Sequence, residues 1–249
     1  MVEEGPPERL VSAILGWLMA RSARKTLRLR ELVFDDGTSG RWLKPDINRH
    51  VKAASLKSRE IRHIETARPP AFGSRIMVEM TVRTIAAYRA LCDAGVEKNC
   101  ARQIVADIVW DIYSKMLGLY SWPFRLTTRD PSKRISRTIK ALLWFPFQAT
   151  GAPGYAVEHW DADGNTYTHF THCPPHSFVR ALIASGGDEG DLDAFRESWC
   201  RYDWPGADIL AGDGRRGHYE RRQTLSHGDS VCNMCWRGCV EDNKGTTHG

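Results

Sequence analysis

Hydrophobic residues recur at intervals of three and four from the start of this 249-residue chain to about Pro146, which is the spacing of amphipathic helices. The pattern predicts one helix near residues 10–20 and another from Ser74, a good N-cap residue, to Gly95, a typical helix stop. Each helix therefore has one face to bury against other elements. The two stripes are Leu10, Val11, Ile14, Leu15, Leu18 and Met19, and Met77, Met80, Thr84, Tyr88 and Leu91.

Two more helices are expected before the pattern changes. One ends near Gly118, and the other opens at Asp130, with Pro131 in the first helical position, and stops before Pro146. The three helices from Ser74 onward are expected to form one packed layer. The stripe of the first of these two helices consists of Ile104, Ile108, Ile112 and Met116.

After residue 150 the hydrophobic period changes from helical to alternating. Residues 155–160 and 166–172 are predicted strands, and Asp163-Gly164 between them is a strong hairpin signal. The remaining elements are short helices at 177–185 and 192–202, followed by a hairpin with strands at 217–225 and 231–236 and a turn at 227–229.

Helices first and hairpins last indicate an α+β fold, with an N-terminal helical layer packed against a C-terminal antiparallel sheet made of hairpins. We divide the chain into a basic N-terminal extension with one amphipathic helix (1–70), an α+β domain (71–240) and a polar tail (241–249). Residues 21–68 hold 13 Lys and Arg against 6 Asp and Glu. This segment is interpreted as a solvated basic face, with an anionic partner such as nucleic acid or lipid headgroups as the alternative.

Overall composition is that of an ordinary globular protein. Hydrophobic residues make up 42% and charged residues 26%, with a net charge of +5, which excludes collagen-like, coiled-coil and fully disordered chains. No apolar run is long enough to cross a bilayer, and the acidic start argues against a signal peptide. We therefore expect a cytoplasmic protein without a transmembrane segment, and nucleic acid is not expected as its main partner.

Seven cysteines in a reducing compartment are expected to be free thiols, catalytic thiols or metal ligands rather than a disulfide framework. Cys232, Cys235 and Cys239 have the spacing of half a zinc site. On an alternating strand, however, Cys232 and Cys235 point to opposite faces, which argues against a local zinc knuckle.

Three cysteines that lie far apart in the sequence are better candidates for a functional site. Cys173 ends a predicted strand, Cys200 lies near the end of a helix, and Cys232 begins the last strand. Each is therefore expected where loops gather and functional sites are built. The alternative is that each is a small, inert, buried side chain.

The chain from Cys173 to Trp236 resembles the L-2-amino-thiazoline-4-carboxylic acid hydrolase family. The family pattern reads Cys-Pro, Cys-x-x-Asp, Arg-x-x-Thr-Leu, and Gly followed by Cys-Asp-Phe, and both order and gaps are similar here. Asn233 and Met234 stand in place of the last Asp and Phe. The resemblance implies a hydrolase-like domain over 71–240. The matching residues are Cys173-Pro174, Trp199-Cys200, Asp203, Tyr219 to Leu225, Gly228-Asp229 and Cys232.

The resemblance further implies hydrolysis of a cyclic amidine, in which a nucleophile attacks the ring carbon between nitrogen and sulfur. Such a reaction needs a held ring nitrogen, an activated nucleophile and a cation for the substrate carboxylate. We assign Arg221 to the carboxylate and Asp203 to the ring nitrogen. The further candidates are Cys173 or Cys200 as nucleophile, His227 as its base, and His169, His172 and Thr224 as substrate-binding residues.

Two alternatives use the same residues. Cys173, Cys200 and Cys232 could bind one zinc ion that activates water, although no cofactor is required by the first interpretation. Alternatively, the domain binds a small molecule or a metal as a sensor, without turnover. A polar cleft around a small anionic heterocyclic substrate favours the enzyme, whereas a mostly apolar pocket favours the sensor. A homo-oligomer is compatible with either function.

Overall fold

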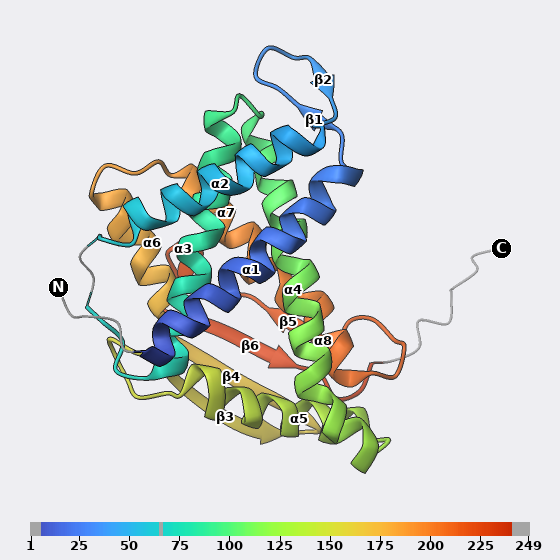
Figure 1. Ribbon diagram of the computed structural model, residues 1–249. Helices are drawn as coiled ribbons and strands as arrows, with labels where there is room; N and C mark the ends of the chain where they lie inside the picture. Colours follow the sequence, from blue (N-terminus) through green and yellow to red (C-terminus); the bar gives the residue numbers. More distant parts are fainter. Residues whose placement is uncertain (1–5, 65–66, 241–249) are drawn as a thin grey trace.

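Long helices form the first part of the molecule in the computed structural model, which describes residues 6–64 and 67–240 (Figure 1). Helices α1 (Pro6–Leu29) and α2 (Lys44–Ile61) pack across α3 (Phe72–Asp93) and α4 (Lys98–Thr127). Between α1 and α2 lies a short hairpin of β1 (Leu32–Val33) and β2 (Ser39–Gly40). The remaining helices are α5 (Pro131–Leu142), the π-helical turn η1 (Leu143–Phe147), α6 (Pro174–Ala184), α7 (Gly190–Ser198), the 3₁₀ turns η2 (Cys200–Tyr202) and η3 (Leu225–His227), and α8 (Asp203–Ala211).

A four-stranded antiparallel sheet lies in the C-terminal part, so the predicted α+β fold class is confirmed. The strand order is β3-β4-β6-β5, and α5 packs against β4. Alternate residues of β4 are buried, which gives the sheet one face toward the helices and one outer face. The strands are β3 (Ala156–Ala162), β4 (Asn165–His172), β5 (Tyr219–Arg221) and β6 (Cys232–Trp236).

The hairpin of β3 and β4 follows the sequence prediction closely. Asp163 and Gly164 occupy its two turn positions with φ of 51° and 73°. Two successive residues with positive φ make a turn whose twist matches that of paired strands, and Asp-Gly tolerates this conformation. The local sequence therefore sets the register of this half of the sheet.

The N-terminal segment shares its core with the helices that follow it. Leu15 and Leu27 of α1 and Ile47 of α2 are buried in one cluster with Ile85 of α3 and Ile108 of α4. The described part of the basic extension (1–70) is thus packed on the α+β domain (71–240). The predicted polar tail (241–249) lies outside the described residues. In the described chain, no helix combines the length and apolar character needed to span a bilayer.

The predicted N-cap of α3 is wrong by three residues. The N-cap is Ala71, and Ser74 lies inside the helix, where its hydroxyl donates to the backbone oxygen of Phe147 at 3.1 Å. Ser74 is fully buried by the chain that returns after α5. A tertiary hydrogen bond therefore uses the side chain that the sequence suggested for capping.

The sequence predicted that α4 ends near Gly118, and this prediction is wrong. The helix continues to Thr127. Leu117 and Ser121 on either side of the glycine are buried. A glycine in a helix interior costs only about 1 kcal/mol relative to alanine. Packing of the buried face therefore outweighs the local preference for a stop.

The predicted helix at 192–202 is interrupted. α7 ends at Ser198, η2 turns the chain at Cys200, and α8, which the sequence did not predict, starts at Asp203. The predicted strand at 217–225 is likewise shortened to β5, and η3 begins at its last residue, Leu225. These breaks change which side chains face inward, among them those of Cys200 and Asp203.

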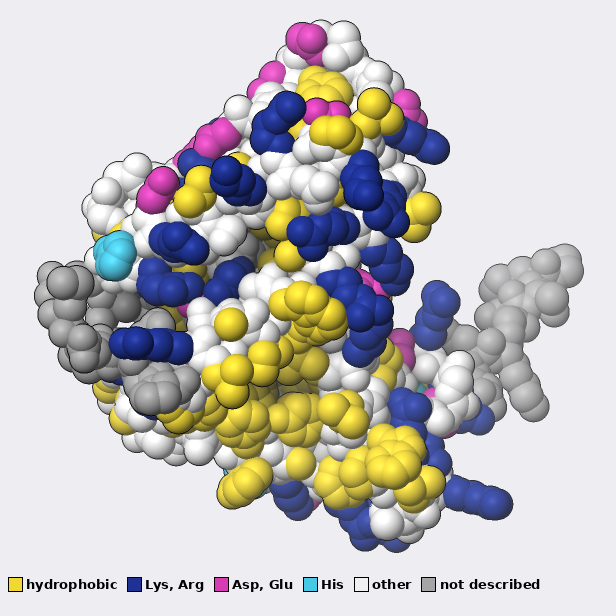
Figure 2. Space-filling view, in the orientation of Figure 1, with side chains coloured by type: hydrophobic (Ala, Val, Ile, Leu, Met, Phe, Trp, Pro, Cys, Tyr) yellow, Lys and Arg dark blue, Asp and Glu magenta, His cyan; other side chains and the backbone are white. Residues whose placement is uncertain are grey.

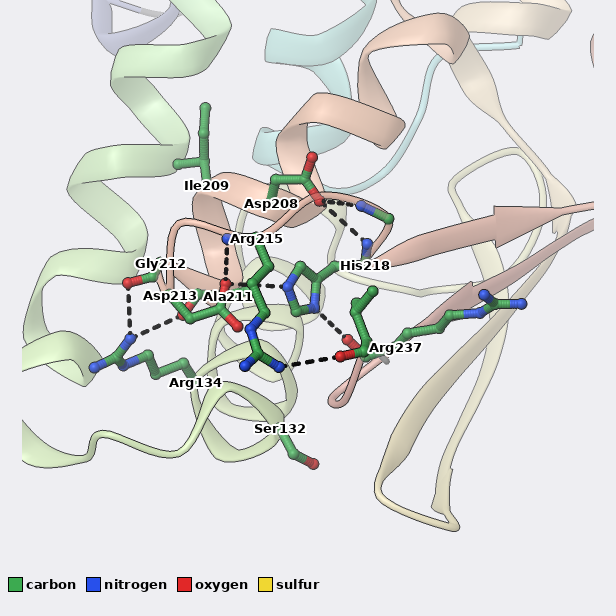
Figure 3. A network of polar contacts seen from close by, with 12 residues as sticks. Ser132, Arg134, Asp208, Ile209, Ala211, Gly212, Asp213, Arg215, His218 and Arg237 are labelled. Atoms are coloured by element: carbon green, nitrogen blue, oxygen red, sulfur yellow. Dashed lines mark hydrogen bonds and ion pairs between the residues drawn. The ribbon is translucent and has the colours of Figure 1, made fainter. Parts of the chain in front are cut away.

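A polar network around His218 fixes the connection between α8 and β5 (Figure 3). The His218 ring is fully buried, with Nδ1 2.8 Å from the backbone oxygen of Arg237 and Nε2 3.1 Å from Oδ1 of Asp213. Oδ1 of Asp208 accepts the backbone N–H of His218 at 3.1 Å. Since both ring nitrogens have partners, His218 has a structural role: it holds the start of β5 in place.

Candidate functional site

A cavity of about 120 Å³ lies between the inner face of the sheet and the helices α3, α4, α5, α7 and α8. Its walls are mostly aliphatic and aromatic. The principal apolar lining residues are Met77, Leu117, Ile139, Leu142, Phe147, Phe170, Phe195, Trp199, Leu210, Met234 and Trp236.

Polar groups line the same cavity, and they come from residues that are distant in sequence. Cys173 is the N-cap of α6, Cys200 lies in η2 and Cys232 begins β6. Asp203 is the first residue of α8, and Arg221 is the last of β5. The structure thus brings these five predicted site residues together, and Thr224 also lines the cavity.

Asp203 and Arg221 form a buried ion pair, with 14% and 6% of their side chains exposed. Nη1 of Arg221 donates to Oδ2 of Asp203 at 2.9 Å, and its Nη2 donates to the backbone oxygen of Cys200 at 3.0 Å. The Tyr219 hydroxyl donates to the same carboxylate oxygen at 3.2 Å. Both Nη atoms of the guanidinium are therefore used inside the protein.

Burial raises the pKa of Asp203 to about 6, while the charge of Arg221 and the hydrogen bonds from Tyr219 and Arg221 oppose the rise. The carboxyl group is thus mainly ionised at neutral pH and partly protonated in mild acid. The Arg221 guanidinium also lies 4.8 Å from the ring centroid of Trp204. This cation–π contact helps hold the cation at the edge of the cavity.

The three thiols are protonated at neutral pH. Burial raises the pKa of Cys200 to about 12 and also raises the pKa values of Cys173 and Cys232. Sγ of Cys232 accepts the backbone N–H of Leu225 at 3.2 Å and lies 3.3 Å from Oγ1 of Thr224. Hydrogen bonding therefore only partly offsets the cost of a thiolate in this environment.

None of the three histidines predicted for the site lines the cavity. His169 is on the outer face of β4, 4.7 Å from Trp160 between ring centroids. Both ring nitrogens of His172 have structural neighbours, with Nδ1 2.6 Å from the backbone oxygen of Gly154 and Nε2 3.0 Å from Oγ of Ser177. His227 is exposed at the end of η3.

His176 lines the cavity instead, and the sequence analysis missed it. Burial and the nearby charge of Arg180 lower its pKa, so the imidazole is neutral at pH 7. It lies in the first turn of α6, three residues after Cys173. Pro174-Pro175 could have predicted that a helix starts here, since proline favours the first helical positions. On such a helix His176 lies on the same face as Cys173, because residues three apart share a face.

The alternative prediction was a zinc ion bound by Cys173, Cys200 and Cys232. Although Cys173, Cys200 and Cys232 line one cavity, no group of three His, Cys, Asp or Glu side chains within residues 6–64 and 67–240 is arranged to hold a metal ion. All seven cysteines are free thiols. We therefore derive no chemical step through a zinc ion.

Comparison of the chain with protein-family models, curated proteins and solved structures gave no match. Function must therefore be inferred from the site itself.

Proposed function

We propose that this protein binds a small, uncharged heterocycle in the central cavity. The observation that carries the proposal is the lining, which is mainly aliphatic and aromatic, with polar groups from Asp203, Arg221 and the three cysteines. Ligand sites commonly combine an apolar wall with a few placed polar groups. An apolar lining is what we expect of a binding domain rather than of an enzyme with an open polar cleft.

Cavity size limits the ligand. A volume of about 120 Å³ is slightly below the roughly 150 Å³ of an engineered cavity that binds benzene. The occupant is therefore one five- or six-membered ring with few substituents. Trp199, Phe147 and Phe170 offer aromatic surfaces against which such a ring can pack.

The charge of the ligand follows from the Asp203–Arg221 pair. Because Arg221 already donates to Asp203 and to the Cys200 backbone, an anionic ligand would have to displace a buried carboxylate. The geometry thus favours a neutral ring over the anion that the family resemblance implies. Asp203 can accept a ring N–H, which makes a nitrogen heterocycle the preferred class.

A binding assay with a cavity-filling variant tests this proposal. The full chain is titrated with thiazolines and hydantoins that are uncharged at pH 7, while the fluorescence of the cavity tryptophans is recorded. Leu225→Phe, at a residue that lines the cavity, should abolish the response. Leu119→Phe is the matched control, since Leu119 is 72% exposed on α4. Equal binding by both variants, or no response from the wild type to any ring, would contradict the proposal.

Hydrolysis of a cyclic amidine is the second candidate, and a different observation favours it. Cys173, His176 and Asp203 line one cavity, and the resemblance to the L-2-amino-thiazoline-4-carboxylic acid hydrolase family implies attack at an amidine carbon. In this mechanism neutral His176 takes the Cys173 proton as the sulfur attacks that carbon. Protonated Asp203 gives its proton to the ring nitrogen, which receives the electron pair of the C=N bond. The ring C–S bond of the adduct then breaks as the nitrogen re-forms the C=N bond, and the departing sulfur takes the proton held by His176. Water adds to the same carbon, and Cys173 leaves as a thiol with a proton from that water, which gives a ring-opened urea.

Turnover measurements separate the two candidates. The hydrolase requires a ring-opened product detectable by chromatography and mass spectrometry, and Cys173→Ser should stop its formation while ring binding persists. Cys239→Ser, an exposed thiol outside the cavity, is the control. Binding without product in the wild type excludes the hydrolase. We place either function in the cytoplasm, where free thiols are stable.

A further inference from the structure

The outward face of α1 carries one regular stripe of side chains that changes character halfway along the helix. Successive members are four and three residues apart, so they lie on one side of the helix. The first three are apolar and the last three are basic, and all six are exposed. The stripe consists of Leu10, Ile14, Trp17, Arg21, Arg24 and Arg28.

A second apolar stripe lies on the last turns of α4. Leu119, Trp122 and Leu126 are 72%, 59% and 70% exposed, and their spacing of three and four residues again keeps them on one side of the helix. Single exposed apolar side chains are ordinary on a protein surface, but contiguous exposed patches mark sites of interaction.

An ion pair shows that the two stripes lie on the same side of the molecule. Nζ of Lys25 on α1 is 2.5 Å from Oδ1 of Asp111 on α4. Lys25 follows Arg21 by one helical turn, and Asp111 precedes Trp122 by about three turns, so each lies on the face that carries its stripe. We call the surface made by the two stripes the α1–α4 face. Figure 2 shows hydrophobic side chains gathered over α1, α4 and α5, with Lys and Arg side chains around them.

The arginines of the stripe keep their charge available. The guanidinium of Arg21 lies 5.4 Å from the ring centroid of Trp17, and Nε of Arg24 donates to the amide oxygen of Asn48 at 3.2 Å. Neither contact neutralises a positive charge. Among the ion pairs within residues 6–64 and 67–240, none involves Arg21, Arg24 or Arg28.

Two carboxylates of α4 that lie beside the end of α1 are already paired. Asp111 binds Lys25 and Lys115, and Asp107 binds Arg30. They therefore leave the charge of the stripe uncompensated. A second copy of the chain on the α1–α4 face would bring the same arginines with it, and like charges would meet. An anionic lipid surface satisfies both halves of the stripe, because it offers negative headgroups above an apolar interior.

We propose that the α1–α4 face docks on a membrane surface that contains anionic phospholipids. The apolar side chains enter the boundary between headgroups and acyl chains, and the three arginines pair with headgroup phosphates. Trp17 and Trp122 suit this boundary, because tryptophan combines an apolar ring with one polar N–H. Helix α1 lies along the membrane and does not cross it. The proposal is independent of the function of the central cavity, since no side chain of either stripe lines that cavity.

Cosedimentation of the full chain with lipid vesicles tests the proposal. The protein should pellet with vesicles of phosphatidylcholine mixed with phosphatidylserine, and not with vesicles of phosphatidylcholine alone. Ile14→Ser should weaken binding to the mixed vesicles about tenfold, the loss of one buried aliphatic side chain. Leu56→Ser is the matched control, because Leu56 is 48% exposed, against 47% for Ile14, and it lies on α2 outside both stripes.

The basic half of the stripe is tested separately. Arg28→Gln should weaken binding to the mixed vesicles about fivefold at low salt, and high salt should reduce this difference. Arg222→Gln changes the net charge equally, and its side chain is 83% exposed at the end of β5, so this variant should bind like the wild type.

The proposal is overturned if the wild type does not pellet with the mixed vesicles, or if it pellets equally with phosphatidylcholine alone. It is also overturned if Ile14→Ser binds like Leu56→Ser, or if Arg28→Gln binds like Arg222→Gln. A dimer in sedimentation velocity that Ile14→Ser dissociates, without any vesicle binding, would show that a second copy covers the α1–α4 face instead.

Discussion

The central cavity and a second cavity of about 470 Å³, which lies between α1, α2 and α3, both contact α3, yet they are lined differently. We call the second cavity the N-terminal cleft. In the cavity, one carboxylate and one guanidinium neutralise each other among apolar side chains. In the N-terminal cleft, small residues leave room for four arginines, of which Arg62 and Arg83 share the carboxylate of Glu79. The same helix therefore borders one mostly apolar space and one space lined by small residues and guanidinium groups.

The comparison also shows how burial acts on groups of opposite type. Burial disfavours whichever protonation state is charged. It raises the pKa of Asp203 in the cavity to about 6 and lowers the pKa of His50 in the cleft to about 4. Both groups are thus moved toward their neutral forms, and they should affect stability in opposite directions over nearly the same pH range.

The largest expected effect concerns the ion pair of the cavity. Arg221→Ala leaves the Asp203 carboxylate buried without its cation, which should destabilise the protein by about 3–5 kcal/mol in urea unfolding at pH 7. Arg222→Ala is the control, since the Arg222 side chain is 83% exposed, and it should change stability by less than about 0.5 kcal/mol. Similar values for both variants would show that the pair is not electrostatically important.

The pH dependence of stability tests Asp203 next. Because the folded state raises its pKa from 3.8 to about 6, the folded protein holds this proton more tightly than the unfolded chain. The contribution of Asp203 to stability should therefore be greatest below pH 4 and fall by about 2 kcal/mol as the pH rises to 6. Asp203→Asn should remove this decline, whereas Asp163→Asn, an exposed carboxyl in the β3–β4 turn, should keep it.

His50 should show the opposite slope. Its folded-state pKa is lowered from 6.5 to about 4, so the unfolded chain binds the proton more tightly in this interval. Stability should then fall by about 2 kcal/mol as the pH drops from 6.5 to 4. In urea unfolding, His50→Gln should remove this contribution. His63→Gln, an exposed histidine just beyond α2, should leave the profile unchanged. A His50→Gln profile that matches the wild type would contradict the assignment.

The smallest expected effect is that of Gly16→Ala. Alanine favours the helix by about 1 kcal/mol over glycine, but its methyl group displaces the flexible end of Arg83. Urea unfolding should detect a net change below about 1 kcal/mol. Gly118→Ala, where a Cβ atom meets nothing within 4 Å, gives the helix term alone. A stabilisation in Gly16→Ala as large as that in Gly118→Ala would show that displacing the end of Arg83 costs no stability.

Local signals in the sequence determined much of the fold. Asp163-Gly164 sets a hairpin turn, and the side chain of Asp130 accepts the backbone N–H of Ser132 at the start of α5, as a cap should. Such features depend on a few neighbouring residues, so they can be predicted without knowing the rest. The same reasoning failed at Ser74 and Gly118, where packing against distant segments overrides local preference.

By itself the sequence determined an α+β chain with helices first and hairpins last, and it singled out Cys173, Cys200 and Cys232. Only the tertiary structure decided that these cysteines share a mostly apolar cavity, that Arg221 is paired with Asp203, and that His176 replaces the predicted histidines. The physical reason is that burial and pairing depend on which elements pack together. A break of one turn, as between α7 and α8, redirects every side chain that follows it.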